Sequence, residues 1–167
     1  MTEQIIAIDI ETTGLIPSEG EILEVSLYAL SNTLDTLDHL HIILPFDNFD
    51  LIMDDTVFNM HSENSLLYEP NNGTLNDIYE FLNKFDKIIF LGNSVSFDKS
   101  WIEYHIPEIR DKISYRSIDT RSFLRLYPKL KNDLPEQPTV HRSEPDVLYS
   151  IQVAKQIYAA LDYAFNN

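Results

Sequence analysis

The chain has 167 residues, a length that suits one domain with its own hydrophobic core, so we expect a single domain over 1–167. It contains no cysteine, which excludes a disulfide framework, a thiolate metal site and a cysteine nucleophile. The formal net charge is −15, with 12 Lys and Arg against 27 Asp and Glu, which disfavours long-range attraction to long nucleic acids. Two kinds of protein fit this charge: an enzyme with no nucleic-acid partner, and one that holds a short substrate through a few local contacts.

The first residues, MTEQIIAIDIETTG, have no basic region and reach an acidic pair at Asp9 and Glu11, unlike a signal peptide. No apolar run in the sequence has the length needed to cross a bilayer. We therefore expect a cytoplasmic protein with no membrane partner.

Three predicted strands open the chain. Residues 4–10 (QIIAIDI) are apolar and rich in isoleucine, as in a strand buried on both faces. Glycine and proline mark 14–20 as a loop, and 22–30 and 36–44 then predict two more strands around a turn at 31–32. Together these segments predict an antiparallel meander.

Helices and strands alternate in the next part of the chain. Residues 46–86 are expected to be helical, with an acidic start at Asp54 and Asp55 and a second helix from Thr74. The elements that follow are a strand at 87–91, a helix at 97–104, a strand at 115–118 and a short helix at 120–126. This order predicts an α/β fold with a mixed five-stranded sheet flanked by helices.

The last helix is preceded by a proline-rich segment. Residues 128–138 contain three prolines and no periodicity, so we expect a mobile loop there. Ser143 can cap the helix, and Pro145 suits its first turn, where a missing N–H costs nothing. A stripe of apolar side chains predicts packing on the core, and it consists of Val147, Ile151, Ala154, Tyr158 and Leu161.

Two carboxylates stand close together on the first predicted strand. Asp9 and Glu11 are two residues apart, so their side chains point to the same side of the sheet, with Cα atoms roughly 7 Å apart. Such a pair suits hard cations, which prefer oxygen ligands. An Asp-x-Glu pair also arises by chance in so acidic a chain. A charged pair within an apolar strand is costly, however, unless it is paired or bound to metal.

Three further polar residues stand at the ends of predicted elements. Asp98 follows the fourth strand where the chain turns into a helix, a place where α/β proteins hold polar ligands. His141 lies at the end of the proline-rich segment, and Asp146 in the first turn of the last helix. Taken singly, each has an ordinary interpretation: the two aspartates as favourable charges at helix N-termini, and the histidine as a surface residue.

Together these residues form a pattern. The segments DIETTGL at 9–15 and GNSVSFD at 92–98, followed by His141 and Asp146, resemble the three motifs of the DEDD exonuclease superfamily in order. Members with tyrosine in place of the histidine carry it four residues before the last aspartate, and that position is Arg142 here. The chain therefore resembles the histidine, or DEDDh, subclass, which implies a ribonuclease H-like fold.

Within this subclass the resemblance is closest to the oligoribonucleases and covers nearly the whole chain. Four further segments carry it: EILEV at 21–25, LIMDDTVFNMHSENSL at 51–66, GNSVSFDKSWIEYHIPEI at 92–109 and SYRSIDTRSFLRLYP at 114–128. The resemblance implies one exonuclease domain over 1–167 that hydrolyses short single-stranded RNA or DNA from the 3′ end to 5′-mononucleotides.

The resemblance also implies a catalytic set and its cofactors. The catalytic residues would be Asp9, Glu11, Asp98, His141 and Asp146. The four carboxylates would hold two divalent cations, Mg²⁺ or Mn²⁺, which can stabilise both the attacking and the leaving oxygen of an in-line displacement. His141 would be the general base, a task that suits a group titrating near neutrality.

A substrate-binding set follows from the same resemblance, and it comprises Thr12, Leu15, His61, Asn93, Ser94, Tyr115 and Arg116. Leu15 would wedge between the two terminal bases, and His61 and Arg116 would cap the 5′-phosphate. Tyr115 would reach across from a second subunit, which implies a homodimer. Without that role, Tyr115 and Arg116 would be an ordinary surface pair on an edge strand.

Some positions depart from the oligoribonuclease pattern. The stacking tryptophan of the family falls on Thr56, which has no aromatic face, although Phe58 is a neighbour that could replace it. A small hydroxyl residue of the cap aligns near Arg121 or Ser122. The loop at 128–140 looks shorter than in typical members. These departures affect the expected preference for dinucleotides more than the chemistry.

Two alternatives stay open at this point. One is a proofreading or RNA-end-trimming exonuclease that acts on longer DNA or RNA 3′ ends. The other is a non-catalytic nucleic-acid-binding or inhibitory module, because a fold alone does not establish activity.

Overall fold

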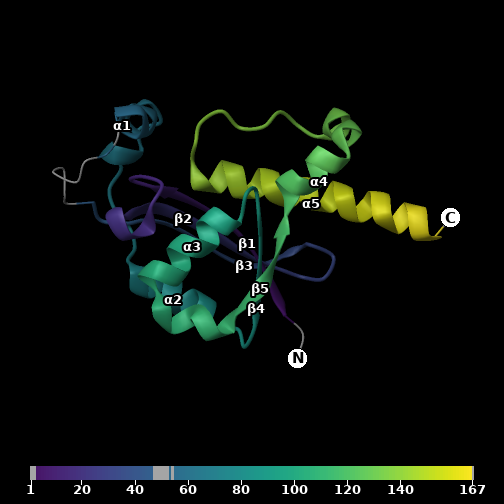
Figure 1. Ribbon diagram of the computed structural model, residues 1–167, viewed down its shortest axis with the longest axis horizontal. Helices are drawn as coiled ribbons and strands as arrows, with labels where there is room; N and C mark the ends of the chain where they lie inside the picture. The colour runs from purple at the N-terminus through teal and green to yellow at the C-terminus, as the bar shows by residue number, and fades with distance from the viewer. Residues whose placement is uncertain (1–2, 47–52, 54, 167) are drawn as a thin grey trace.

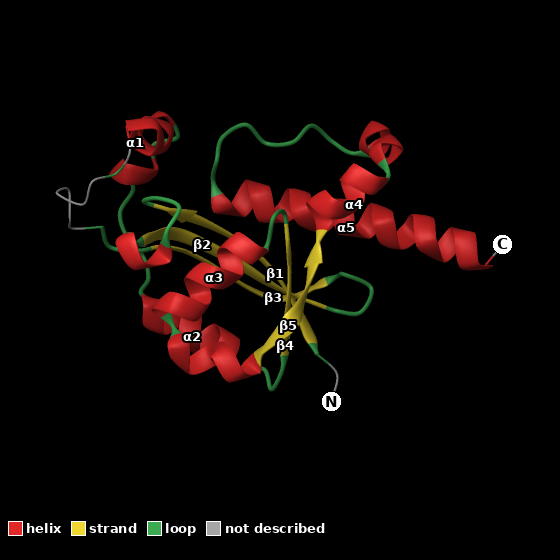
Figure 2. Ribbon diagram, in the orientation of Figure 1, coloured by secondary structure: helices red, strands yellow, loops and turns green. Residues whose placement is uncertain are grey.

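A five-stranded mixed sheet forms the centre of the computed structural model, which describes residues 3–46, 53 and 55–166 (Figure 2). The strands are β1 (Gln4–Thr12), β2 (Ile22–Leu30), β3 (Thr36–Ile43), β4 (Ile88–Gly92) and β5 (Ile113–Asp119). Their order is β3-β2-β1-β4-β5. The first three strands pair antiparallel, and β4 and β5 add in parallel. The predicted mixed five-stranded sheet is therefore confirmed.

The helices cover both faces of the sheet (Figure 1). They are α1 (Asp55–Glu63), α2 (Leu75–Asn83), α3 (Ser96–His105), α4 (Thr120–Leu126) and α5 (Ser143–Asn166). On one face, α2 and α3 pack Phe81 and Trp101 into the main core, against alternate β1 residues such as Ile8. On the other face, Val147 of α5 packs with Ala7 and its neighbours. Because side chains alternate along a strand, Asp9 and Glu11 share the α5 face with Ala7.

Several predicted boundaries shift for physical reasons. In the expected helical stretch, α1 and α2 are separated by a 3₁₀ turn at 66–68, and Asp54 lies outside the described residues. The segment expected as a mobile loop begins with a 3₁₀ helix at Pro128–Asp133. Leu130 within this helix and Leu134 directly after it pack against Leu124 and the outer side of α5, which holds this part of the segment in place.

The apolar stripe predicted on the last helix is only partly buried. Val147, Ile151 and Ala154 are in the core, but Tyr158 and Leu161 are 46% and 47% exposed. The reason is visible in Figure 1, where the C-terminal part of α5 extends beyond the sheet. The hydroxyl of Ser143, expected as a helix cap, instead hydrogen-bonds Ser26 Oγ on β2 at 2.8 Å.

Within the described ranges, none of the helices is both long enough and apolar enough to span a membrane.

Candidate active site

Three carboxylates from two elements meet on the α5 face of the sheet. Asp9 and Glu11 extend from the C-terminal half of β1, and Asp146 extends from the first turn of α5. One carboxylate oxygen of each residue lies within 4.8 Å of the others. The strand alternation predicted that Asp9 and Glu11 share a face. The packing of α5 across β1 brings Asp146 to them.

Asp98 reaches the same strand from α3. It is 4% exposed, and its Oδ1 accepts a hydrogen bond from the backbone N–H of Ile10 at 3.0 Å. The parallel pairing of β1 with β4 ends at Ala7, so this edge of β1 is open at Ile10. The carboxylate of Asp98 fills that opening. Its charge raises the pKa of Asp9, so the two groups are close enough to interact.

All four carboxylates have raised pKa values. Burial is the largest cause for each, and it raises the pKa of Glu11 and of Asp98 to about 8. For Asp9, burial is followed by repulsion from Asp98 and Glu11. The pKa of Asp146 is raised by burial, although the charge of His141 opposes the shift. The metal-free cluster thus brings together more negative charge than nearby side chains neutralise.

This cluster fits divalent cations. Its donors are carboxylate oxygens, which hard cations such as Mg²⁺ and Mn²⁺ prefer, and they are close together, buried or half-buried, and mutually repelling. A bound cation would remove the repulsion and the desolvation cost together. Asp9, Glu11, Asp98 and Asp146 are the residues that could hold it.

His141 lies on the loop that leads into α5, with an exposed side chain. Its charge lowers the pKa of Asp146, so the ring is near enough to interact electrostatically with the cluster. Its φ is 25°, in the left-handed region that non-glycine residues rarely adopt. Asn64 Nδ2 donates a hydrogen bond to its carbonyl, which fixes the loop to the end of α1. The five residues predicted as catalytic thus gather around the C-terminal end of β1.

Three of the predicted substrate-binding residues follow or face β1. Thr12 is buried, and its hydroxyl donates to the carbonyl of Gly14 at 2.7 Å. Leu15, at the tip of the same loop, is 81% exposed, as a side chain that meets a base would be. His61 on α1 is fully buried, with Nε2 donating to the Thr12 carbonyl at 3.0 Å and lying 4.0 Å from Glu11 Oε2. His61 therefore supports the backbone beside the carboxylates.

The other predicted binding residues lie on the far side of β4. Asn93 and Ser94 follow this strand, and Ser94 has a positive φ of 62°. The Ser94 hydroxyl accepts a hydrogen bond from Arg121 Nη1 at 3.3 Å, beside an open hollow of about 530 Å³. Tyr115 and Arg116 are exposed on the edge strand β5, where the guanidinium lies 4.8 Å from the centre of the tyrosine ring.

The two positions on α1 where the family's stacking residue was considered are on the surface. Thr56 is exposed in the first turn of the helix, and Phe58 is 44% exposed two residues later. Phe58 is therefore the exposed aromatic side chain of α1.

Sequence reasoning missed a buried ionic group next to the cluster. Glu24 is opposite Glu11 in the β1–β2 pairing and is completely buried. Arg142, His41 and the N–H of Ser143 all contact its carboxylate. A charged residue within the apolar segment 22–30, together with an arginine directly after His141, was the available signal.

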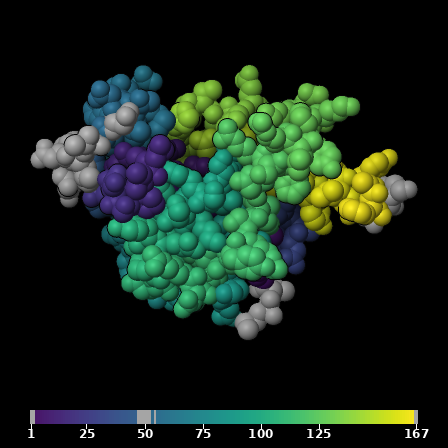
Figure 3. Space-filling view, viewed as in Figure 1, coloured from purple at the N-terminus to yellow at the C-terminus, as the bar shows by residue number. Residues whose placement is uncertain are grey.

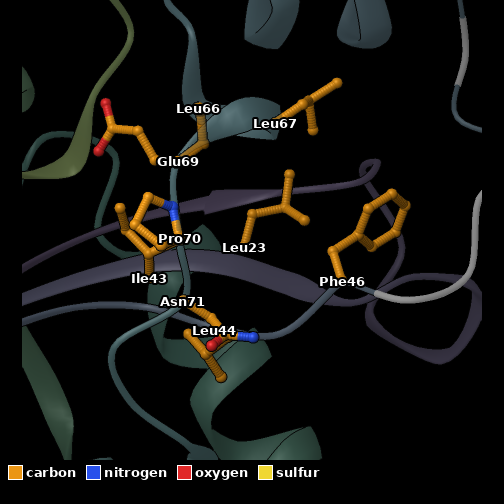
Figure 4. Close-up of a pocket in the computed structure, with 9 residues that line it drawn as sticks. All are labelled: Leu23, Ile43, Leu44, Phe46, Leu66, Leu67, Glu69, Pro70 and Asn71. Atoms are coloured by element: carbon orange, nitrogen blue, oxygen red, sulfur yellow. The ribbon is translucent and has the colours of Figure 1, made fainter.

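A separate pocket of about 280 Å³ lies near this group (Figure 4). Leu23, Phe46 and Leu66 are among its lining residues, and none of the four clustered carboxylates is. Glu69 is its one acidic lining residue, and Figure 4 shows the Glu69 carboxylate turned away from Leu23 and Phe46. The pocket is therefore a feature beside the candidate site, and its lining differs from that of the acidic cluster.

Comparison with known proteins agrees with this geometry. Residues 6–154 match the family model RNase_T, described as Exonuclease. The oligoribonuclease of Tropheryma whipplei is 31% identical over 157 residues, which cover 86% of this chain and 85% of that protein. The oligoribonuclease of Corynebacterium glutamicum is 26% identical over 166 residues, which cover 90% and 76%.

Solved structures show the same fold. Exonuclease I of E. coli in complex with a 5cy-dA13 oligonucleotide has a TM-score of 0.69 at 15% identity. Exonuclease I of Methylocaldum szegediense has a TM-score of 0.71 at 16% identity. Both alignments cover 99% of this chain, which spans less than half of those larger proteins, 43% and 42%.

The fold and the acidic cluster define a nuclease of a divalent-metal-dependent class, and the chain belongs to the exonuclease family. Within that family it is an oligoribonuclease-like member of the DEDDh type. The resemblance predicted from the sequence motifs is therefore confirmed.

The raised pKa values predict how the stability of the metal-free protein depends on pH. Folding raises the pKa of Glu11 from 4.5 to about 8, so the folded protein retains protons that the unfolded chain releases. Stability should therefore fall as the pH rises from about 4.5 to about 8, and each kcal/mol lost should lower Tm by ~2–4 °C. Thermal unfolding in EDTA across this range measures the effect.

The control for this measurement is Asp9→Asn, which removes one charge from the cluster and should flatten the decline. Mn²⁺ should restore stability at pH 8 in the unmodified protein, because it binds only the folded cluster. A metal-free protein that becomes more stable over the same pH range would contradict the repulsion described above.

Proposed function

We propose that this protein is a 3′→5′ exonuclease that hydrolyses short single-stranded oligonucleotides, oligoribonucleotides foremost, to 5′-mononucleotides. The observation that carries this proposal is the group of four carboxylates, of which Glu11 and Asp98 are buried and Asp9 and Asp146 half-buried, with His141 beside it. The family match and the oligoribonuclease relatives support the same reaction.

The four carboxylates have the role of cation ligands. Asp9, Glu11, Asp98 and Asp146 would hold two divalent cations, Mg²⁺ or Mn²⁺. When bound, the cations supply positive charge for the attacking and the leaving oxygen of the displacement. The protein fixes the ligand positions beforehand, because β1, α3 and α5 are all held by the core.

His141 has the role of general base. Its side chain is exposed beside Asp146, so it can face a water molecule that attacks the terminal phosphodiester. An imidazole titrates near neutrality and can take the proton from that water.

Binding of short strands rests on local contacts. Leu15 is exposed three residues after Thr12 and can wedge against a terminal base, and Asn93 and Ser94 directly follow β4. Arg116 and Tyr115 are exposed on an edge strand, where a second copy of the chain can approach. A homodimer would let each pair cap a 5′-phosphate at its partner's site and so limit substrate length.

Other expectations stay predictions. The family match over residues 6–154 supports one exonuclease domain over 1–167. The cytoplasmic location rests on the sequence features alone.

Substrate length is the direct test of this function. We expect the protein with Mn²⁺ or Mg²⁺ to release 5′-mononucleotides from RNAs of two to five nucleotides faster than from a strand of twenty nucleotides. EDTA and Asp9→Asn should each abolish the activity. A panel that varies length and sugar, resolved one nucleotide at a time, gives the answer. Faster hydrolysis of the long strand would favour an exonuclease that trims long 3′ ends, and complete inactivity would favour a binding module.

The second prediction concerns the base. His141→Ala should lower kcat by ~10²–10⁴-fold with a smaller effect on substrate affinity, because the proton acceptor is lost while the binding contacts remain. Steady-state kinetics on a dinucleotide measure the change, and high pH should partly restore the rate. His39→Ala, an exposed histidine on β3, is the matched control. An unchanged kcat in His141→Ala would contradict the assignment.

The third prediction concerns the cap. Arg116→Ala should weaken hydrolysis of 5′-phosphorylated dinucleotides by ~10–150-fold, the value of a charge-assisted contact of ~1.5–3 kcal/mol. Dinucleotides without the 5′-phosphate should lose little. Arg110→Ala, an exposed arginine on the turn before β5, is the control. Equal losses on both substrates would remove Arg116 from the cap, and a monomer with full activity would argue against the dimer.

A further inference from the structure

We propose that Arg142 is a positioning residue, which holds the loop of His141 and the start of α5 in place by bridging two glutamates, Glu24 on β2 and Glu69 after α1. This inference rests on the proposed function, because it is His141 and Asp146 that the bridge would align.

The inner half of the bridge is buried. Arg142 Nε lies 3.1 Å from both carboxylate oxygens of Glu24, and Nη2 lies 2.8 Å from Oε1. The Ser143 N–H donates to Glu24 Oε2 at 2.9 Å, so the same carboxylate also holds the first residue of α5. His41 Nε2 on β3 completes the set at 2.8 Å from Oε1. Glu24 therefore joins the N-terminus of α5 to the middle of the sheet.

The outer half of the bridge reaches the segment that follows α1. Arg142 Nη1 lies 2.7 Å from Glu69 Oε1, and Nη2 lies 3.1 Å from Glu69 Oε2. The Glu69 side chain is 40% exposed, in contrast to the fully buried side chain of Glu24. One guanidinium thus contacts both carboxylates. An arginine has the planar set of donors for this task, and a lysine has not.

The bridge surrounds a strained backbone. His141, directly before Arg142, has a φ of 25°. Such a conformation costs ~1–3 kcal/mol and persists only where neighbouring structure holds it. Its carbonyl accepts a hydrogen bond from the side chain of Asn64, and Arg142 Nη1 lies 3.5 Å from the Asn64 carbonyl. Figure 3 shows α1 close to the loop that precedes α5. The backbone is therefore held on both sides, and the ring of His141 is free to face solvent.

The two halves of the bridge should have different effects. The Arg142 carbonyl accepts from the Asp146 N–H at 3.2 Å, so the inner half supports a carboxylate of the cluster as well as the histidine. The outer half contacts only the segment beside the His141 loop. Removing Glu69 should therefore disturb the histidine and leave the cation ligands in place.

The experiment compares Glu69→Gln with Asp38→Asn. The second variant removes an exposed ion pair of equal length, Lys84–Asp38 at 2.7 Å, on the far edge strand β3. For Glu69→Gln we expect a fall in kcat by ~10–100-fold, as when a supporting partner of a site residue is lost. KM, Mn²⁺ affinity by calorimetry and Tm should change little. Asp38→Asn should keep the kcat of the unmodified protein.

Arg142→Lys is a second variant that keeps the positive charge next to Glu24. It should reproduce the kcat loss of Glu69→Gln, because an ammonium group cannot span both carboxylates. Arg142→Ala is less informative, because it leaves Glu24 buried without its partner and is expected to destabilise the fold. Hydrogen exchange of the amides at 139–142 should become faster in both Glu69→Gln and Arg142→Lys.

The outcomes separate this inference from the proposed function. Unchanged kcat and unchanged exchange at 139–142 in Glu69→Gln, with an active unmodified protein, would overturn the bridge alone. A kcat loss that Asp38→Asn shares would also overturn it. If the unmodified protein hydrolyses no oligonucleotide, the proposed function fails. Faster exchange confined to 139–142 would even then support the bridge as the element that holds this loop.

Discussion

The structure depends on one electrostatic constraint, the gathering of four buried or half-buried carboxylates around the C-terminal end of β1. Each element that supplies one must be held firmly enough to resist their repulsion, because separation would relieve it. β1 is the central strand of the sheet, α3 is fixed by the fully buried Trp101 and Ile102, and α5 by Val147 and its neighbours. The apolar core therefore sets the positions of the charges. The pKa values of these carboxylates are raised because burial and mutual repulsion act on them when no cation is bound.

Glu24 shows that this cost comes from missing partners and not from burial alone. It is completely buried and lies opposite Glu11, yet its pKa is lowered. Burial would raise that pKa, and the hydrogen bonds from Arg142, His41 and the Ser143 N–H outweigh it. Glu24 and Glu11 are therefore neighbours on paired strands with different partners. Glu24 has its positive partner within the chain, and Glu11 is available to a cation from solution.

The sequence predicted those features that depend on short spacings. The two-residue separation of Asp9 and Glu11 placed both on one face, and the resemblance to the DEDDh motifs joined Asp98, His141 and Asp146 to them. The contacts that depend on tertiary distances were not predictable. Asp98 binds the Ile10 N–H because the β1–β4 pairing stops at Ala7. No local sequence pattern predicts where the pairing of β1 with β4 ends.

Burial in the finished fold was equally hard to foresee. The resemblance implied that His61 contacts a phosphate, but it did not show that the side chain is fully buried and bonded to the Thr12 carbonyl. Tyr158 and Leu161 follow the helical stripe correctly, but each is about half exposed, on the C-terminal half of α5. Arg142 bridges residues 118 and 73 positions away, Glu24 and Glu69, and only the packing of α5 across the sheet brings them together.

The distribution of positive charge explains how so acidic a protein can hold a phosphate. The chain has 12 Lys and Arg, and the ion pairs found among the described residues involve Arg142, Lys84, Lys99 and Lys155. Residues 116–131, on β5, α4 and the following 3₁₀ turn, contain five of the 12 and only one acidic residue, Asp119. That aspartate accepts hydrogen bonds from the backbone of Val95 and Ser122.

The net charge of −15 therefore does not describe this part of the surface. Coulomb attraction between exposed charges is screened within ~10 Å, so a short strand responds to the local charge here more than to the total. A long strand would extend past this segment and meet the acidic remainder of the molecule.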